Sequence, residues 1–263
     1  MSDEMNETPR EPETVEPAAP AAPVEPVGEP APSSIAVMLG LLTSPAETFR
    51  KIDGKGGWAC LAPFIILIVF GMVSGMVFTH RVNMEEFIRQ QMLKGPHASE
   101  MSEAQIDQGV QMGTKFAKMA TYAGFVMITI KYLLVAVVLW LVVLAFGDTI
   151  TFPDTFRVVC WSQLPNILFT ILAIVVLFVR DPMTLDPKNL VMSNLGAILG
   201  EERLGKAGYA FFSDLDVFTL WLLWLYTRGL AAFAKAKVGK MAAVTFGLFA
   251  ILVLGHTAFA AIF

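Results

Sequence analysis

The residues that could do chemistry in this sequence are polar side chains inside long apolar runs. The densest group is the stretch WSQLPN at residues 161–166. Pro165 has no N–H to donate, so it frees the backbone carbonyl of Trp161. Neighbouring side chains could satisfy that carbonyl, or they could line a small polar cavity. The candidates for either arrangement are Ser162, Gln163 and Asn166.

Charged and titratable side chains near the apolar runs form a second group of candidates. Lys131 lies inside a run, where an unpaired charge is costly. Its ammonium could reach the interface along its apolar stem, or it could pair with Asp214 or Asp216 at the start of a later run. Arg157 and His256 are further candidates, and for His256 we expect an interhelical hydrogen bond rather than a proton relay.

Motifs of catalytic and metal sites are absent from the sequence. There is no His-Glu-x-x-His, no Gly-x-Ser-x-Gly and no Gly-rich phosphate loop, and the three histidines lie in separate segments. Cys60 and Cys160 fall within apolar runs, so we expect buried thiols rather than a disulfide. We therefore expect no enzyme, no metal site and no cofactor. The net charge of -4 also argues against a nucleic-acid partner.

The composition indicates a membrane protein. Hydrophobic residues make up 55% of the chain and charged residues 16%, and the mean hydropathy is +0.61. Apolar runs of about 20 residues are long enough to span a bilayer as helices, and these are continuous rather than alternating. The predicted fold is an all-α, polytopic membrane helix bundle with five transmembrane helices, at about 58–79, 124–147, 156–179, 216–234 and 242–262.

The N-terminal region divides into two parts ahead of the membrane domain at 58–263. Residues 1–33 are acidic and rich in proline, so we expect a disordered tail. Residues 34–57 are predicted to form interfacial amphipathic helices. Within them Ser44 could cap a helix that starts at Pro45, with Glu47 completing a capping box. The residues expected to dock on the membrane are Phe49, Arg50, Lys51, Ile52, Lys55 and Trp58.

The two long loops also have predicted structure. Residues 80–122 should form two helices separated at Gly95 and Pro96. Ser102 with Gln105 gives a second capping box, and this helix should run into the second span. Residues 187–200 are too short to span, so they are either an interfacial or re-entrant helix or an ordered loop.

The distribution of basic residues predicts the orientation. The segment between the fourth and fifth spans contains bases and no acid, so it should be cytoplasmic. Five spans then place the N-terminus on the cytoplasmic side and Phe263 on the opposite side, most simply in a bacterial inner membrane. The bases are Arg228, Lys235, Lys237 and Lys240.

The order of several local sequences resembles the Yip-domain family of five-span membrane proteins, named after Ypt-interacting proteins. These sequences are LLTSPAETFRKI, FGDTITFPDTFRVVCWSQLP and DLDVFTLWLLWL, and the resemblance covers about residues 35–262. It implies five spans and a cytoplasmic N-terminus. The Asp-Leu-Tyr-Gly-Pro segment of eukaryotic members is missing, with GDTITFPD in the comparable loop. In this departure the chain is similar to a prokaryotic member of the family, so we do not transfer a trafficking role from the eukaryotic members to this chain.

Two classes of function remain open. One is a non-enzymatic membrane scaffold or adaptor, with the bundle in the bilayer and the tail binding protein partners. The alternative is a small transporter or permeation accessory that uses Lys131, Gln163, Asn166 and His256 around an intramembrane cavity. A solvent-accessible cavity reaching these residues would favour transport, and a tightly packed bundle would favour a scaffold. GMVSG at 71–75 is interpreted as a site of close helix packing rather than of chemistry. A homo-oligomer is compatible with the sequence, which does not determine the oligomeric state.

Overall fold

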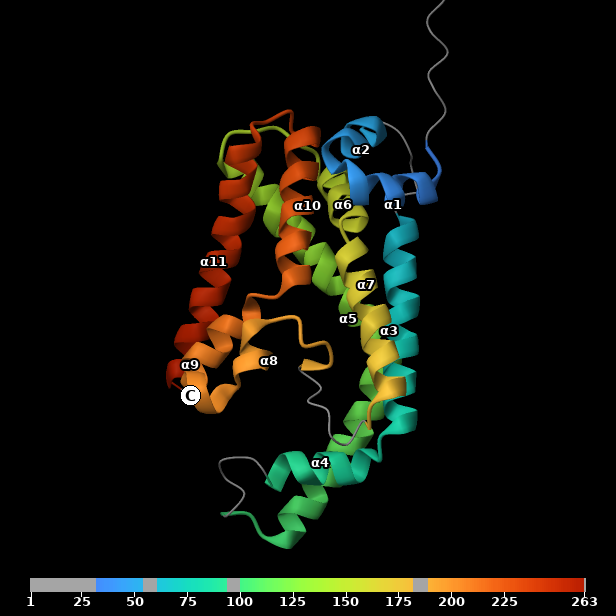
Figure 1. Ribbon diagram of the computed structural model, residues 1–263, viewed down its shortest axis with the longest axis vertical. Coiled ribbons are helices and arrows are strands. Elements are labelled where there is room, and N and C mark those ends of the chain that lie inside the picture. The colour runs from blue at the N-terminus through green and yellow to red at the C-terminus, as the bar shows by residue number, and fades with distance from the viewer. Residues whose placement is uncertain (1–31, 54–60, 94–99, 182–188, 263) are drawn as a thin grey trace, which may run out of the picture. The chain divides into compact units, whose positions relative to one another are not determined.

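A computed structural model describes residues 32–53, 61–93, 100–181 and 189–262. The predicted all-α class is confirmed, because the described residues form helices and contain no β-strand, only an isolated bridge between Asn194 and Asp216. The helices, shown in Figure 1, are α1 (Ser34–Thr43), α2 (Pro45–Ile52), α3 (Leu61–Arg81), α4 (Met84–Leu93), α5 (Glu103–Ala145), α6 (Phe152–Trp161), α7 (Leu164–Val179), α8 (Leu195–Leu199), α9 (Glu201–Asp214), α10 (Val217–Phe233) and α11 (Val238–Ile262).

The long helices run back and forth between two ends (Figure 1). α3 packs along α5 and α7, and α10 packs along α7 and α11. We call one end the α2 end, which comprises α1, α2, the loop 146–151 and the turn 234–237. We call the other the α9 end, which comprises α8, α9 and residues 256–262 of α11. α9 lies against α11, and α4 lies separately against the beginning of α5.

Within the part of the chain that the structure describes, four helical segments are long and apolar enough to cross a membrane: 61–81, 123–145, 152–179 and 238–262. The predicted fifth span at 216–234 corresponds to α10, which has only 17 residues. Asp216 caps its first turn and Lys235 leaves the helix with a φ of 51°, so the apolar run cannot extend further as a helix. Its length of about 26 Å is short of a hydrocarbon core of about 30 Å. The predicted number of full-length spans, five, was therefore too high by one, because α10 is too short.

The predicted entry of the first long loop into the second span is correct. α5 is one helix of 43 residues, and Ser102 and Gln105 form the capping box at its start. Both partners of a capping box lie within one turn, so local sequence can indicate it, although the other predicted box, Ser44 with Glu47, is not formed. The predicted break at Gly95 and Pro96 falls outside the described residues.

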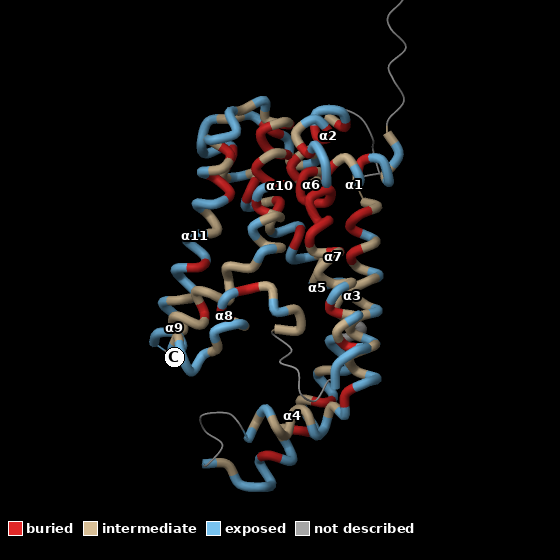
Figure 2. The backbone as a smooth tube through the Cα atoms, in the orientation of Figure 1, coloured by how far each residue is buried: buried red, intermediate tan, exposed pale blue. Residues whose placement is uncertain are grey.

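The core is concentrated at the α2 end. Figure 2 shows buried residues gathered around α2, α6 and α10, whereas α4 and α9 are largely exposed or half-buried. At Gly229 the packing is so close that a Cβ atom would lie 2.5 Å from Val158 Cγ1 and 3.1 Å from the Phe49 ring. Phe49 also contacts the Phe233 ring edge-on. These residues join α2, α6 and α10 into one packed unit.

The structure corrects the predicted membrane docking of α2. Phe49 is 0% exposed and Ile52 is 5% exposed, because α2 packs on α10 rather than presenting its apolar side to lipid. Ser44 makes no side-chain cap, and Glu47 pairs instead with Lys51 at 2.8 Å. That hydrogen bond and the positive charge of Lys51 lower the pKa of Glu47. Lys55 and Trp58 lie outside the described residues.

Of the two structures predicted for residues 187–200, the described part is closer to an ordered loop than to an interfacial helix. This part holds only the five-residue α8, capped by Asn194, after which Gly200 has a φ of 79° and α9 begins. α9 is itself kinked at Gly205, which has a φ of 66°. The left-handed backbone at these glycines prevents one continuous helix. The beginning of the predicted segment, residues 187–188, lies outside the described residues.

Candidate functional site

The candidate site lies where the third apolar segment breaks. α6 ends at Trp161, and α7 begins at Leu164 with Pro165 in its first turn. Gln163 N–H donates to the Cys160 carbonyl at 3.2 Å, which leaves the Val159 carbonyl without its usual donor. The Gln163 side chain donates to that carbonyl at 2.7 Å. Gln163 therefore satisfies a freed carbonyl as predicted, but the carbonyl belongs to Val159 rather than Trp161.

Gln163 also connects three helices through hydrogen bonds. Its amide nitrogen donates to the Tyr226 hydroxyl of α10 at 3.1 Å. The Asn166 amide nitrogen donates to Gln163 Oε1 at 2.8 Å and to the Tyr132 hydroxyl of α5 at 3.1 Å. We call Tyr132, Gln163, Asn166 and Tyr226 the Gln163 network.

Three members of the Gln163 network are buried in protein, and the fourth, Asn166, is half-buried. Gln163 is 0% exposed, and both tyrosines are buried. Unpaired polar groups inside a membrane protein cost several kcal/mol, so these side chains stabilise the positions of α5, α7 and α10 by satisfying one another. Ser162 is also fully buried, but its hydroxyl has no hydrogen-bond partner among the described residues and is not part of the network.

The sequence prediction missed Tyr132 and Tyr226. A signal was present, because each tyrosine lies inside a predicted span. A tyrosine hydroxyl buried in an apolar environment normally finds a hydrogen-bond partner. The partners come from a helix distant in sequence, so only the tertiary structure shows which amides they are.

The predicted pairing of Lys131 with Asp214 or Asp216 is not found among the described residues. The ammonium of Lys131 lies 5.3 Å from the centre of the Tyr132 ring, on an exposed face of α5. Asp216 accepts hydrogen bonds from the backbone N–H groups of Phe218 and Thr219, and Ser193 donates to its other oxygen. The unpaired N–H groups at the start of α10 thus engage this carboxylate.

Asp214 contacts His256, which is another of the residues singled out from the sequence. Its Oδ2 lies 2.7 Å from His256 Nδ1, which joins α9 to α11. Both residues line a pocket of about 480 Å³ at the α9 end, together with Glu201, Lys206 and Tyr209. The pocket is polar and titratable, so its chemistry suits a polar ligand more than an apolar one.

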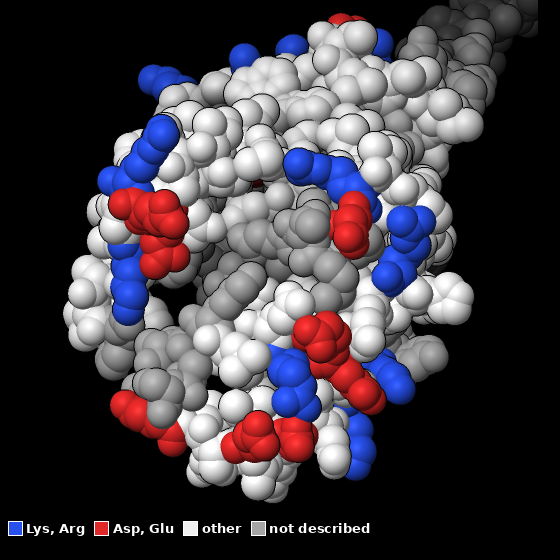
Figure 3. All heavy atoms as spheres, turned by 60° about the horizontal axis from the view of Figure 1, so that its bottom comes forward, with Lys and Arg blue, Asp and Glu red and all other residues white. Residues whose placement is uncertain are grey.

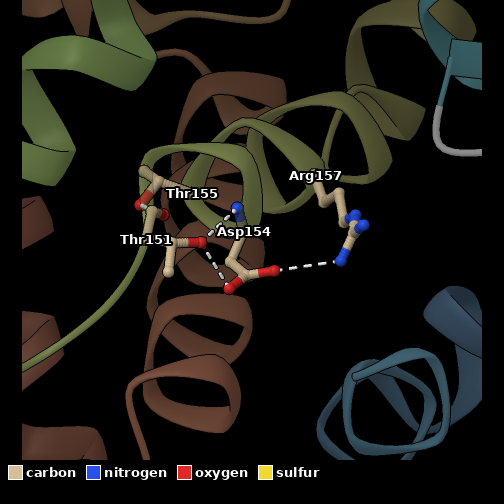
Figure 4. Close-up of polar contacts among 4 residues, drawn as sticks. All are labelled: Thr151, Asp154, Thr155 and Arg157. Carbon is tan, nitrogen blue, oxygen red and sulfur yellow. Dashed lines mark hydrogen bonds and ion pairs between the residues drawn. The ribbon is translucent and has the colours of Figure 1, made fainter. Parts of the chain in front are cut away.

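Arg157 belongs to the start of α6 rather than to the Gln163 network. Figure 4 shows that Asp154 lies between Thr151 and Arg157. Thr151 caps the helix by accepting from Asp154 N–H and donates to the Asp154 carboxylate at 2.6 Å, while Arg157 pairs with the same carboxylate at 3.0 Å. Thr155 donates to the Thr151 carbonyl at 3.1 Å. This cluster fixes the helix start, where a carboxylate is also favoured by the helix dipole.

The described residues contain no group of three or more His, Cys, Asp or Glu side chains that could hold a metal ion. Within the spans, the assembled polar groups of the Gln163 network are amides and phenols. Their arrangement can brace helices and exclude water, and it offers no nucleophile paired with a general base.

Comparison with models of protein families identifies a family for this chain. The model of the Yip1 domain family matches residues 39–262, which covers the region from α1 to the end of α11. No curated protein and no solved structure gives a significant match to the chain.

Proposed function

Because the chain belongs to the Yip1 domain family and has several helices long and apolar enough to cross a membrane, we propose that this integral membrane protein is a non-enzymatic scaffold or adaptor. The bundle anchors the chain in the bilayer. The acidic tail at 1–33 binds protein partners, because its charges and prolines favour an extended, accessible segment. Family membership supports the membrane assignment, and the packing of the bundle supports the scaffold role.

The observation that carries this proposal is the closed Gln163 network. Three hydrogen bonds hold Gln163 and Asn166 to α5, α6 and α10, a fourth joins the two amides, and Gln163 has no exposed surface. A transport path through these residues would have to break bonds that have no water to replace them. A packed bundle whose buried polar groups form hydrogen bonds with one another is suited to act as a rigid anchor.

The alternative, a transporter or permeation accessory, is not favoured by the same residues. Lys131 lies on an exposed face of α5, and Gln163 is enclosed. His256 lines the pocket at the α9 end, whose lining includes no member of the Gln163 network. The polar residues expected around one cavity are therefore distributed over separate places.

The proposed orientation puts the α2 end in the cytoplasm of a bacterial cell. Arg50, Lys51, Lys235 and Lys237 all belong to this end, and short basic flanks favour the cytoplasmic side. Single cysteines at Lys237 and Glu86, in a background without Cys60 and Cys160, test this with a membrane-impermeant thiol reagent on intact cells. Only the cysteine at residue 86 should react. Reaction at residue 237 would reverse the orientation.

The scaffold role is tested by comparing three chains in cells: the full chain, a chain without residues 1–33 and a chain with the same tail residues in scrambled order. Quantitative crosslinking of the full chain should recover a set of partner proteins, and these should be lost when residues 1–33 are deleted. All three chains should remain in the membrane with equal thermal stability. A scrambled tail that retains the partners would indicate recognition by charge and composition. If proteoliposomes containing the protein showed a solute flux, and the substitution Gln163→Leu abolished that flux, the result would contradict the scaffold proposal and favour transport.

A further inference from the structure

A small basic pocket lies at the α2 end, between α2, the last part of α10 and the beginning of α11. It encloses about 260 Å³, and its charged lining residues are Arg50 and Arg228. The other walls consist mainly of alanines, so the pocket stays open beside the two guanidinium groups. The alanines are Ala46, Ala231, Ala232 and Ala236.

Neither arginine forms a salt bridge with the described acids at this end, which are Glu47, Asp53, Asp148 and Asp154, although the charge of Arg50 contributes to the lowered pKa of Glu47. Glu47 pairs with Lys51, Asp148 pairs with Lys240 at 2.9 Å, and Asp154 pairs with Arg157. Neither Arg50 nor Arg228 has a described carboxylate within salt-bridge distance, and no acid lines the pocket. Two cations sharing one cavity without an anion repel each other, so the cavity favours an anionic ligand.

The arginines are held in place by the core beneath them. Arg50 follows the buried Phe49 on α2, and Arg228 precedes Gly229 on α10, where the two helices make close contact. Arg50 Nε donates to the Ala46 carbonyl at 3.2 Å, and the Arg228 guanidinium lies 5.6 Å from the centre of the Trp224 ring. These contacts orient both side chains and leave donors for a ligand. Guanidinium groups bind phosphate oxygens through paired hydrogen bonds.

The position of the pocket indicates the source of the phosphate. It lies beyond the apolar part of α10 and beside the first residue of α11, Val238. Trp224 is partly exposed next to Arg228, and tryptophan is enriched at the level of lipid headgroups. The partial positive charge at the start of α11 adds to that of the arginines. We propose that Arg50 and Arg228 bind the phosphate of an anionic phospholipid headgroup.

This lipid site goes beyond the scaffold role and does not depend on it. It also replaces the predicted insertion of α2 into the interface, because Phe49 and Ile52 are buried in protein and leave Arg50 to contact the lipid through its charge. A lipid bound here would contact α2, α10 and α11 together and so stabilise their packing.

The test uses the full chain in a mild neutral detergent, titrated with phosphatidylglycerol or phosphatidylcholine and monitored by melting temperature and native mass spectrometry. Phosphatidylglycerol should raise the melting temperature and bind more tightly than phosphatidylcholine. In the double variant Arg50→Gln with Arg228→Gln, this preference should fall about tenfold. The matched control, Lys235→Gln with Lys237→Gln, removes two exposed charges from the same end and should retain the preference.

The outcomes distinguish a specific lipid-binding site from non-specific electrostatic attraction. Arg228→Lys keeps the charge, so it should fold and lose part of the preference, since an ammonium cannot offer the same paired donors. An equal loss in the lysine control would overturn the site in favour of diffuse charge. If inorganic phosphate or glycerol phosphate gave the same stabilisation at equal concentration, the proposal that a lipid supplies the bound phosphate would be overturned. No difference between the two lipids would overturn the proposal altogether.

Discussion

The α2 end and the α9 end contain similar kinds of polar residue but arrange them differently. Near the α2 end, apolar packing at Phe49 and Gly229 adjoins the Gln163 network, in which the Gln163 amide is fully buried. At the α9 end, His256 and Asp214 line an open pocket, and the His256 side chain is 54% exposed. Burial, rather than residue type, determines which polar groups stabilise the fold and which remain available to a ligand.

Charged side chains are also exposed at the end of the molecule that contains α4. Figure 3, which brings the lower end of the molecule in Figure 1 forward, shows acidic and basic side chains interspersed over that end. Arg89 of α4 pairs with Asp107 of α5 in an exposed position, and exposed ion pairs of this kind contribute little to stability. The His256–Asp214 contact at the α9 end is partly exposed as well. We therefore expect substitutions in the buried packing near the α2 end to lower the free energy of unfolding more than substitutions at the α9 end.

The largest effect should come from Phe49→Ala. This substitution leaves a cavity between α2 and α10, which typically costs about 3–5 kcal/mol for a buried phenylalanine. Phe116→Ala is the control, because Phe116 is largely exposed on α5. Denaturant unfolding in mild detergent measures both. Equal stability of the two variants would show that the α2 contact contributes nothing to the bundle.

Gly229→Ala should have the next largest effect. The added methyl group meets Val158 and the Phe49 ring, and overpacking of this kind costs about 1–3 kcal/mol. Gly247→Ala in α11 is a matched control, since its Cβ would meet nothing within 4 Å and alanine favours a helix. A thermal melt should show a loss for the first variant and no loss for the second. A stabilised Gly229→Ala variant would contradict the close packing of α2, α6 and α10.

Gln163→Leu should lower the free energy of unfolding by about 1–3 kcal/mol, because it leaves the Val159 carbonyl and the Tyr226 hydroxyl without their partner. Thr129→Val is a control, since the Thr129 hydroxyl is exposed and bonds within its own helix. A double-mutant cycle with Tyr226→Phe isolates the contact between the two helices. Strict additivity in that cycle would mean that Gln163 and Tyr226 do not interact.

The smallest effect should come from His256→Ala at the α9 end. The His256–Asp214 contact is partly exposed, and such pairs contribute at most about 1 kcal/mol. Melting of this variant beside Gln163→Leu compares the two ends directly. If His256→Ala lost more stability than Gln163→Leu, the proposed difference between the two ends would be reversed.

The features predicted correctly from sequence are those set by neighbouring residues. The Ser102–Gln105 capping box and the continuous α5 depend on one turn and one apolar run. The side of α2 that contains Phe49 and Ile52 was assigned to lipid because an apolar stripe has the same sequence pattern whether lipid or protein covers it. Only the contact with α10 distinguishes the two.

The candidate site was predicted in part for the same reason. Gln163, Pro165 and Asn166 stand out locally as polar or helix-breaking residues in an apolar run. Their tyrosine partners come from α5 and α10, distant in sequence. Of the two alternatives for Lys131, the pairing with Asp214 or Asp216 is not found among the described residues, because sequence position gives an approximate depth in the membrane but not the direction in which a helix faces.

The enclosure of the Gln163 network is tested most directly by cysteine accessibility. Asn166→Cys and His256→Cys are made separately in a chain lacking Cys60 and Cys160, and opened membrane vesicles are treated with a membrane-impermeant thiol reagent. Residue 256 lies at an exposed pocket and should react quickly, whereas residue 166 is half-buried between the helices of the Gln163 network and should react far more slowly until the protein is denatured. Reaction of the cysteine at residue 166 as fast as that at residue 256 would show a water-filled path to the network and contradict a closed membrane scaffold.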